Sequence, residues 1–306
     1  MTQDSSSPSA HVPGRIRATI IGGTAVLLWS TLALLTTVTG QTPPFLLVSL
    51  SFGIAFAIAL GKWVVFREPV TRHLRQPAAV WLLGIYGLFG YHFFYFLALR
   101  NAPAVDASLI AYLWPLLIVV LSAFLPGDRL RWWHVAGAVS GLVGTGLLVT
   151  KGGSLALRSE FLLGYGASLA CAVIWATYSV ANRRFASVPT DAVGGMCGAT
   201  ALLAAICHLV FETTVWPRGA EWLAVIALGI GPVGIAFYVW DHGTKHGDIR
   251  LLGVSSYAAP LISTIILVVA GKAAATWIVA TAALLIVGGA ALASLDVLRA
   301  SGKRAA

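Results

Sequence analysis

Residues 87–94 of the chain read GLFGYHFF, and residues 231–238 read GPVGIAFY. The two stretches share the pattern G-x-x-G-x-x-F at a shift of 144 residues. Three further matches keep the same order at nearly the same shift. They are Trp29 with Trp175, Tyr-x-x-Pro-Leu at 112–116 with 257–261, and Gly144 with Gly288. Matches in one order at a nearly constant shift indicate an internal duplication.

The composition places this duplicated chain in a membrane. Of its 306 residues, 58% are hydrophobic and only 10% are charged, and the mean hydropathy is +0.86. A soluble domain carries about 25% charged residues, so these few charges do not suffice for a wettable surface. Ten apolar segments, each about long enough to cross a bilayer, predict an all-α integral membrane protein. The predicted spans are 19–38, 45–66, 78–99, 104–125, 133–149, 162–182, 193–211, 222–240, 252–269 and 276–295.

The duplication divides the spans into two groups of five. Because five is odd, the second copy enters the membrane from the opposite side, which makes the two copies inverted repeats. Inverted repeats recur in alternating-access transporters, whose substrate site lies near the midplane between the repeats. We therefore predict a carrier with a central cavity. Its parts are a disordered cytoplasmic tail at 1–14, repeats at 15–150 and 151–298, and a cytoplasmic tail at 299–306.

The formal charge of +9 is a topology signal. If the N-terminus is inside, 15 of the 20 basic residues fall in inner segments and 5 in outer segments. Basic residues concentrate in cytoplasmic loops, so both termini are predicted to be cytoplasmic. The charge therefore requires no nucleic-acid partner. The first apolar run is too long for a signal peptide and lacks a clear cleavage site.

The letters GIGPVG at 229–234 spell G-x-G-x-x-G, the pattern of a dinucleotide-binding loop. That pattern binds a nucleotide only between a strand and a helix. Here it lies inside an apolar span with Pro232 in its middle, so no cofactor is predicted. The shared GxxG instead predicts a packing face at which the helix can also bend, and the alternative is that glycine and proline are simply common in membrane helices. Cys171, Cys197 and Cys207 all lie within spans and are predicted to be small packing residues.

Aromatic residues fall into two groups along the spans. Trp63, Trp81, Trp132, Trp133, Trp222 and Trp277 lie at span ends, as expected for interfacial belts. The second group lies nearer the middle, where a tyrosine needs a hydrogen-bond partner or water. We predict that this group lines an aqueous cavity, and the alternative is buried packing between helices. Its members are Trp29, Tyr91, His92, Tyr95, Tyr112, Trp114, Trp175, Tyr178, Tyr238 and Tyr257.

Such a cavity suits a flat, partly apolar solute. No Asp, Glu, Lys or Arg lies clearly at mid-span, although such charges mark ion and proton pathways. His92 is therefore predicted to be a hydrogen-bonding wall residue, and both proton coupling and facilitated diffusion stay open. Pro115 and Pro260 occupy matching places and are predicted hinges, with static kinks as the alternative.

A charged segment follows the predicted eighth span, at residues 241–250. Its mixed charges predict a solvated loop or an ion pair that acts as a gate. The spacing of His242 and His246 is compatible with a metal, but a mixed-charge loop is more often solvated, so no metal site is predicted. Gly137, Gly141, Gly144, Gly288 and Gly289 predict close packing of the fifth and tenth spans.

The inverted five-span halves, the Trp29 and Trp175 pair and the two Tyr-x-x-Pro-Leu motifs resemble the drug/metabolite transporter superfamily, EamA branch. The segments GYHFFYF at 90–96 and YLWP at 112–115 are similar to those of aromatic amino acid exporters of the YddG type. The resemblance implies export of phenylalanine, tyrosine and tryptophan across a bacterial inner membrane, and in some members export of aromatic cations such as methyl viologen. Many relatives carry Glu after the fourth helix of each half, where this chain has Asp128 and Gly271-Lys272.

Other functions remain as alternatives at this point. The same carrier fold also suits threonine, homoserine, cysteine metabolites or purines, whereas a nucleotide sugar requires basic residues at mid-span. An intramembrane enzyme is the alternative from another class. The GAS at 166–168 faintly resembles a rhomboid-type serine motif, but no clear histidine partner exists. The sequence leaves the oligomeric state open, and a monomer is compatible with it.

Overall fold

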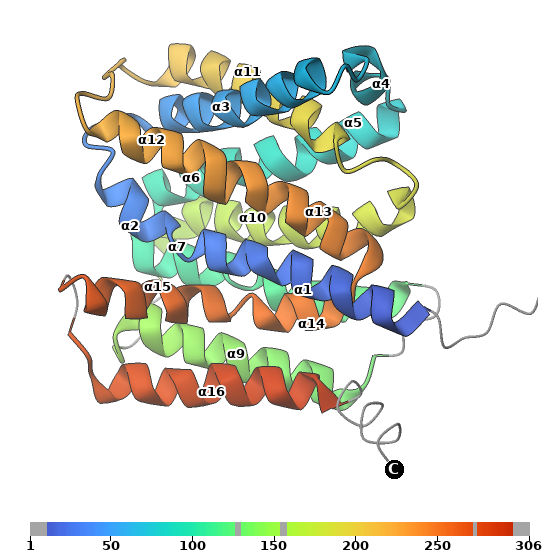
Figure 1. Ribbon diagram of the computed structural model, residues 1–306. Coiled ribbons are helices and arrows are strands. Elements are labelled where there is room, and N and C mark those ends of the chain that lie inside the picture. Colours follow the sequence, from blue (N-terminus) through green and yellow to red (C-terminus); the bar gives the residue numbers. More distant parts are fainter. Residues whose placement is uncertain (1–10, 126–129, 154–157, 272–273, 296–306) are drawn as a thin grey trace, which may run out of the picture.

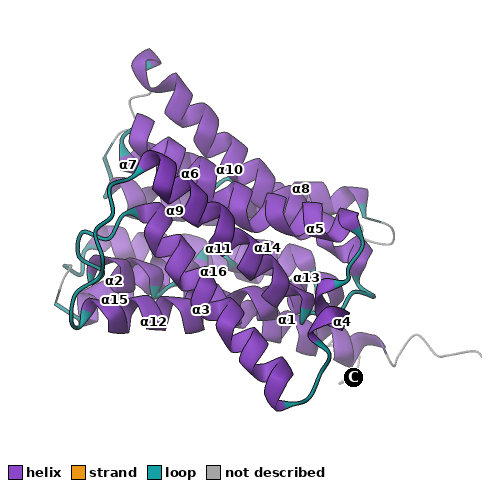
Figure 2. Ribbon diagram, turned by 90° about the horizontal axis from the view of Figure 1, so that it is seen from above, coloured by secondary structure: helices purple, strands orange, loops and turns teal. Residues whose placement is uncertain are grey.

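The computed structural model describes residues 11–125, 130–153, 158–271 and 274–295 (Figure 1). Helix α1 (His11–Trp29) takes in the last four residues of the segment predicted to be an N-terminal tail. The rest of that tail, the C-terminal tail, Asp128 and Lys272 lie outside the described residues. Throughout the described ranges the ordered elements are helices, with no strand (Figure 2). The dinucleotide-loop interpretation of GIGPVG therefore has no strand to precede it.

The ten predicted spans are confirmed. Within the described residues, nine helical segments are long and apolar enough to cross a membrane, and the tenth, α16, is shorter. The first repeat contains α1 with α2 (Leu32–Thr37), α3 (Pro44–Val65), α5 (Ala78–Ile85) with η2 (Tyr86–Gly90) and α6 (Tyr91–Asn101), α7 (Ala104–Ala111) with α8 (Trp114–Leu121), and α9 (Trp132–Thr150). The second contains α10 (Leu162–Ala181), α11 (Ala192–Phe211), α12 (Glu221–Ile230) with η6 (Gly231–Ile235) and α13 (Ala236–His246), α14 (Ile249–Ser255) with α15 (Ala258–Val269), and α16 (Trp277–Ala293).

The packing of the helices repeats the duplication. Helix α1 of the first repeat packs along α13 of the second. The equivalent helices, α10 of the second repeat and α6 of the first, also pack against each other. The pairs α3 with α11 and α9 with α16 each join equivalent helices of the two repeats. Figure 1 shows α9 and α16 side by side at one edge of the bundle. Helix α1 begins and α16 ends on the same side, as an even number of spans requires.

Both GxxG motifs form π-helical turns. The turns η2 and η6 occupy equivalent places in the third and eighth spans, and Pro232 lies inside η6. A π turn inserts an extra residue into an α-helix and is frequent at functional sites. The shared glycines thus coincide with an irregular turn in both repeats, and the bend itself stays a prediction.

The fourth and ninth spans are each broken just before their proline. Helix α7 ends at Ala111 and α8 begins at Trp114, whereas α14 ends at Ser255 and α15 begins at Ala258. Proline has no N–H for the carbonyl four residues earlier, and its ring clashes with that carbonyl. The break therefore falls about one turn before Pro115 and before Pro260, so both predicted kinks exist.

Glycines allow two helix pairs to approach closely. A Cβ atom on Gly22 of α1 would lie 2.7 Å from Gly243 Cα of α13. In the α9–α16 pair, a Cβ on Gly137 or Gly289 would collide with the carbonyl oxygen of the other glycine. Close packing of the fifth and tenth spans is thus confirmed. Gly288, however, faces open space, so its predicted packing role is wrong.

The Gly22–Gly243 crossing supplies a matched test within one helix. We expect Gly22→Ala to lower the thermal unfolding temperature in detergent, because overpacking of a close contact costs about 1–3 kcal/mol. Gly23→Ala is the control, since its Cβ would meet nothing within 4 Å. Equal unfolding temperatures for the two variants would contradict this account of the crossing.

Candidate functional site

Five aromatic rings from both repeats meet inside the bundle. This aromatic cluster consists of Trp29 on α1, Trp114 on α8, Trp175 on α10, and Phe237 and Trp240 on α13. The Trp29 ring centroid lies 5.0 Å from that of Trp240 and 5.7 Å from that of Trp175. Many of the pairs are edge-to-face, an arrangement worth about 0.5–1.5 kcal/mol per pair beyond area burial. The cluster is therefore a stable contact between the repeats.

Helix α6 extends the cluster with a second row of rings. Tyr91 lies 5.5 Å from Trp175 and stacks on Tyr95, one turn further along α6, at 5.9 Å. The Tyr95 hydroxyl is 3.3 Å from the hydroxyl of Ser108 on α7. His92 lies edge-on to Phe52 of α3 at 5.2 Å. Tyr91, His92 and Tyr95 thus lie beside the cluster.

Burial differs within this group of rings. Trp114 and Trp175 are 7% and 4% exposed. Trp29, Tyr91, Tyr95 and Tyr112 are half-buried, although the first two contact the ring of Trp175 directly. The deep rings are thus flanked by rings that retain accessible surface.

The indole N–H groups of the two equivalent tryptophans have different environments. Trp29 Nε1 donates to the carbonyl of Pro232, inside η6, at 3.1 Å. The equivalent carbonyl in the first repeat is that of Leu88, and it accepts a 2.7 Å hydrogen bond from His92 Nδ1. Among the described residues, Trp175 Nε1 has no hydrogen-bond partner, and it is not one of the fully buried unpaired atoms either. Trp175 therefore carries an indole N–H that no described group accepts, on a side chain that is 4% exposed.

Three of the residues predicted to line the cavity lie elsewhere or face neighbouring helices. Tyr178 is 2% exposed and packs over Gly87 beside Trp175. The Tyr238 hydroxyl lies against α11, where a Cβ on Gly194 would be 2.6 Å away. Tyr257 is fully buried in a separate apolar cluster, and its hydroxyl accepts the backbone N–H of Leu116 at 3.1 Å. The structure thus brings together Trp29, Tyr91, His92, Tyr95, Trp114 and Trp175, while Tyr112 is half-buried at the break between α7 and α8.

Three of the central rings are not among the residues predicted from the sequence. Phe52 and Phe237 are phenylalanines, whose apolar rings give no signal that separates a site from ordinary packing. Trp240 was taken as the end of the eighth span, but α13 continues to His246 and places Trp240 inside the bundle. Trp63 was assigned to the interfacial belt, and this is wrong because its ring is fully buried. Trp132 and Trp277 are exposed at helix ends, as predicted.

A buried charged network begins at Asp241, the residue directly after Trp240 of the aromatic cluster. Asp241 accepts hydrogen bonds from Asn182 Nδ2 at 2.9 Å, from the Thr190 hydroxyl at 2.7 Å and from Lys245 Nζ at 2.9 Å. Asp241 and Lys245 are 1% and 5% exposed. Of the two alternatives predicted for this segment, the solvated loop is wrong here and an ion pair is present, while its action as a gate stays a prediction. The two charges are one helical turn apart and neutralise each other, so the helix continues through them.

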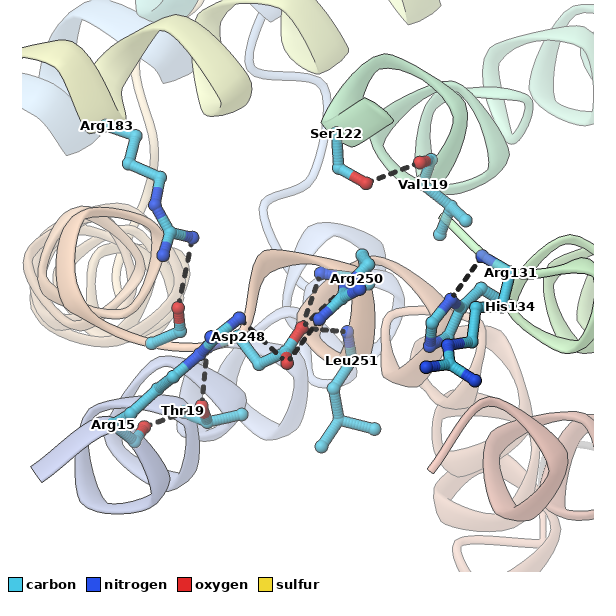
Figure 3. Close-up of polar contacts among 11 residues, drawn as sticks. Arg15, Thr19, Val119, Ser122, Arg131, His134, Arg183, Asp248, Arg250 and Leu251 are labelled. Carbon is cyan, nitrogen blue, oxygen red and sulfur yellow. Dashed lines mark hydrogen bonds and ion pairs between the residues drawn. The ribbon is translucent and has the colours of Figure 1, made fainter. Parts of the chain in front are cut away.

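A second network joins α1 to the junction between α13 and α14 (Figure 3). Arg15 Nη2 lies 3.0 Å from Asp248 Oδ2, and the Asp248 N–H donates to the Thr19 hydroxyl at 2.7 Å. Arg250 also contacts Asp248, and Arg183 donates to the carbonyl of Gly247 at 3.2 Å. Burial raises the pKa of Asp248, but the Arg15 and Arg250 guanidiniums outweigh it, so the pKa lies below its usual range. The charged carboxylate therefore links the two repeats at this end.

Two inverted five-helix repeats that share a central aromatic cluster define a membrane carrier. The chain belongs to the EamA-like transporter family, whose model matches it twice, over residues 17–150 and 162–295. The two matches confirm the duplication predicted from the sequence. They place the chain among transporters, so the intramembrane enzyme is excluded as an alternative.

Individual relatives agree with this assignment. The chain is 61% identical over 282 residues to the aromatic amino acid exporter YddG of Ancylobacter novellus, covering 92% of this chain and 98% of that protein. It is 26% identical over 264 residues to the aromatic amino acid exporter YddG of Salmonella typhimurium, covering 81% and 86%. A protein crystal structure that is 60% identical superposes with a TM-score of 0.88, covering 92% of this chain and 98% of that one.

Proposed function

We propose that the protein exports aromatic amino acids, and related aromatic cations such as methyl viologen, from the cytoplasm by alternating access. Relatives that are 61% and 26% identical carry the name of aromatic amino acid exporter. The observation that carries the proposal is the unused indole N–H of Trp175, which lies among aromatic rings contributed by both repeats. An aromatic amino acid presents a flat ring and a carboxylate, and this site offers partners for both.

The energies are of the right size for a carrier. A few aromatic contacts of about 0.5–1.5 kcal/mol each, together with a charge-assisted hydrogen bond of about 1.5–3 kcal/mol, approach the roughly 4–8 kcal/mol of millimolar to micromolar binding. Tighter binding would slow release on the other side. An aromatic cation is compatible with the same rings through cation–π contacts.

We assign the substrate to the space bordered by Trp29, Tyr91, Tyr95 and Tyr112. Their partial exposure next to the deeply buried Trp175 supports a wet cavity at this place. His92 donates from Nδ1 to the carbonyl of Leu88, so the other ring nitrogen, Nε2, is the one available to a solute. Tyr238 and Tyr257 are no longer assigned to the substrate, because each contacts a neighbouring helix.

The distribution of basic residues supports an inner-membrane orientation with both termini in the cytoplasm. In this orientation the Arg15–Asp248 network lies at the cytoplasmic end, where the Gly22–Gly243 crossing also brings α1 against α13. These contacts link the two repeats, so we propose that they close the cytoplasmic side. The substrate then leaves toward the opposite side.

Transport by purified protein in liposomes tests the proposal. We expect uptake of labelled phenylalanine to exceed that of threonine and of adenine. We also expect Trp175→Phe, which keeps a ring but removes the N–H, to raise the half-saturating concentration about tenfold, as loss of about 1.4 kcal/mol predicts, and to lower the unfolding temperature less than Trp29→Phe does. A pH gradient, applied or omitted, separates proton-coupled export from facilitated diffusion.

Trp29→Phe is the matched control. It removes a hydrogen bond to Pro232 that holds the two repeats together, so it is expected to lower the unfolding temperature. Faster uptake of threonine or adenine than of phenylalanine would contradict the proposed substrate. An unchanged half-saturating concentration in Trp175→Phe would remove Trp175 from the site.

The breaks before Pro115 and Pro260 are the proposed hinges of the cycle. A hinge governs the rate of opening and closing more than the affinity of either state. We therefore expect Pro260→Ala to lower the maximal transport rate several-fold while the half-saturating concentration stays close to that of the parent. If both parameters stay unchanged, the kink is static.

A further inference from the structure

A group of potential metal ligands lies far from the aromatic cluster, where the first repeat meets the second. Glu68 follows α3, His73 lies on the short helix α4 (Val70–Leu74), and Asp191 precedes α11. One ligand atom from each residue lies within 4.8 Å of the other two. Asp191 is more than a hundred residues away from the other two in the chain, so no sequence spacing reveals this group.

His73 is the anchor of the group. Its side chain is 5% exposed, and its ring stacks on Trp63 with centroids 4.7 Å apart and an interplanar angle of 10°. In the part of the chain that the structure describes, neither ring nitrogen has a hydrogen-bond partner. Leaving a buried polar nitrogen without a partner costs free energy. A ligand bound to one nitrogen of the His73 ring would remove that cost for this nitrogen.

The distance between His73 and Glu68 is compatible with two ligands of one ion. His73 Nε2 lies 2.7 Å from Glu68 Oε2, but the two atoms are not aligned as a hydrogen-bond donor and acceptor. Atoms bound to one ion at about 2.0–2.2 Å lie roughly 3 Å apart when they are neighbours in its coordination shell. The nitrogen and the oxygen are thus close enough together to bind the same ion as neighbouring ligands.

We propose that Glu68, His73 and Asp191 bind a divalent transition-metal ion of the Zn²⁺ class. Imidazole nitrogen with carboxylate oxygens suits such ions, whereas Ca²⁺ and Mg²⁺ take oxygen ligands. The three ligand atoms lie within 4.8 Å of one another, so Asp191 must move closer to the other two to complete the shell. The ion then ties the turn after α3 to the start of α11.

Lys62 is the internal competitor for this ion. Its Nζ lies 2.6 Å from Asp191 Oδ1, and its side chain is 41% exposed. An exposed lysine side chain moves away at little cost in free energy. The two carboxylates of Glu68 and Asp191 then balance the two positive charges of the metal ion. Arg67, Arg72 and Arg75 are also near in sequence, but all three are exposed, where salt screens their charges.

Metal titration of the purified full-length protein in detergent tests the site. After treatment with a chelator, we expect one Co²⁺ per chain, detected by its visible absorption, and displacement of Co²⁺ by Zn²⁺. His73→Phe keeps the stacking on Trp63 but removes the ligand nitrogen, so it is expected to weaken Co²⁺ binding at least tenfold. Glu68→Gln and Asp191→Asn are expected to weaken it as well, and they decide the matter if His73→Phe fails to fold.

Two further variants test whether Co²⁺ binds at this site and whether Lys62 competes with it. Lys62→Gln is expected to tighten Co²⁺ binding several-fold, because the competing ammonium is gone. His242→Phe is the control. His242 and His246, with ring centroids 5.0 Å apart, form a histidine pair that is also compatible with a metal. Absence of binding up to about 1 mM, or binding that is lost in His242→Phe and kept in His73→Phe, overturns the proposal. Weaker binding in Lys62→Gln overturns it too, because the lysine then supports the group.

Discussion

A helix in lipid has to satisfy every backbone polar group within the protein, and among the described spans of this chain the first, third, fourth, eighth and ninth are interrupted. The third and eighth spans contain π turns, and the fourth and ninth are broken before their prolines. At the third, fourth and eighth spans, side chains form hydrogen bonds with the backbone groups of the interrupted segments. Trp29 binds the carbonyl of Pro232, His92 binds that of Leu88, and Tyr257 accepts the N–H of Leu116. Two of these three hydrogen bonds cross from one repeat to the other, so satisfying the backbone also joins the repeats.

The same constraint makes the two repeats unequal. In the second repeat the π-turn carbonyl is bound by a tryptophan from the first repeat, whereas in the first repeat it is bound by His92 of the same helix. The position equivalent to His92 is Ala236, which has no polar side chain. One histidine therefore releases the indole of Trp175 from a structural role. An otherwise symmetric scaffold thereby differs between its two copies at the indole N–H of this tryptophan, and such an asymmetry suits an asymmetric solute such as an amino acid.

The fold was predictable to a large extent, because hydropathy and an odd number of spans per repeat leave few arrangements. The site was only partly predictable. Trp29, Tyr91 and Trp175 stand out as aromatic residues at mid-span, but Phe52 and Phe237 carry no signal beyond apolarity. Trp240 was missed because the charges after it suggested that the helix had ended. Asp241 and Lys245 are buried only because each neutralises the other, and a single sequence does not show such pairing in space.

We propose that rings from both repeats hold the aromatic ring of the substrate beside Trp175. The most direct measurement is the anomalous diffraction of bromine in crystals of the protein grown with 4-bromophenylalanine. The account predicts one bromine peak per chain, bordered by Trp29, Tyr91 and Trp175. A peak at the lipid-facing surface or between other helices, in crystals of protein that transports the same compound, would contradict it.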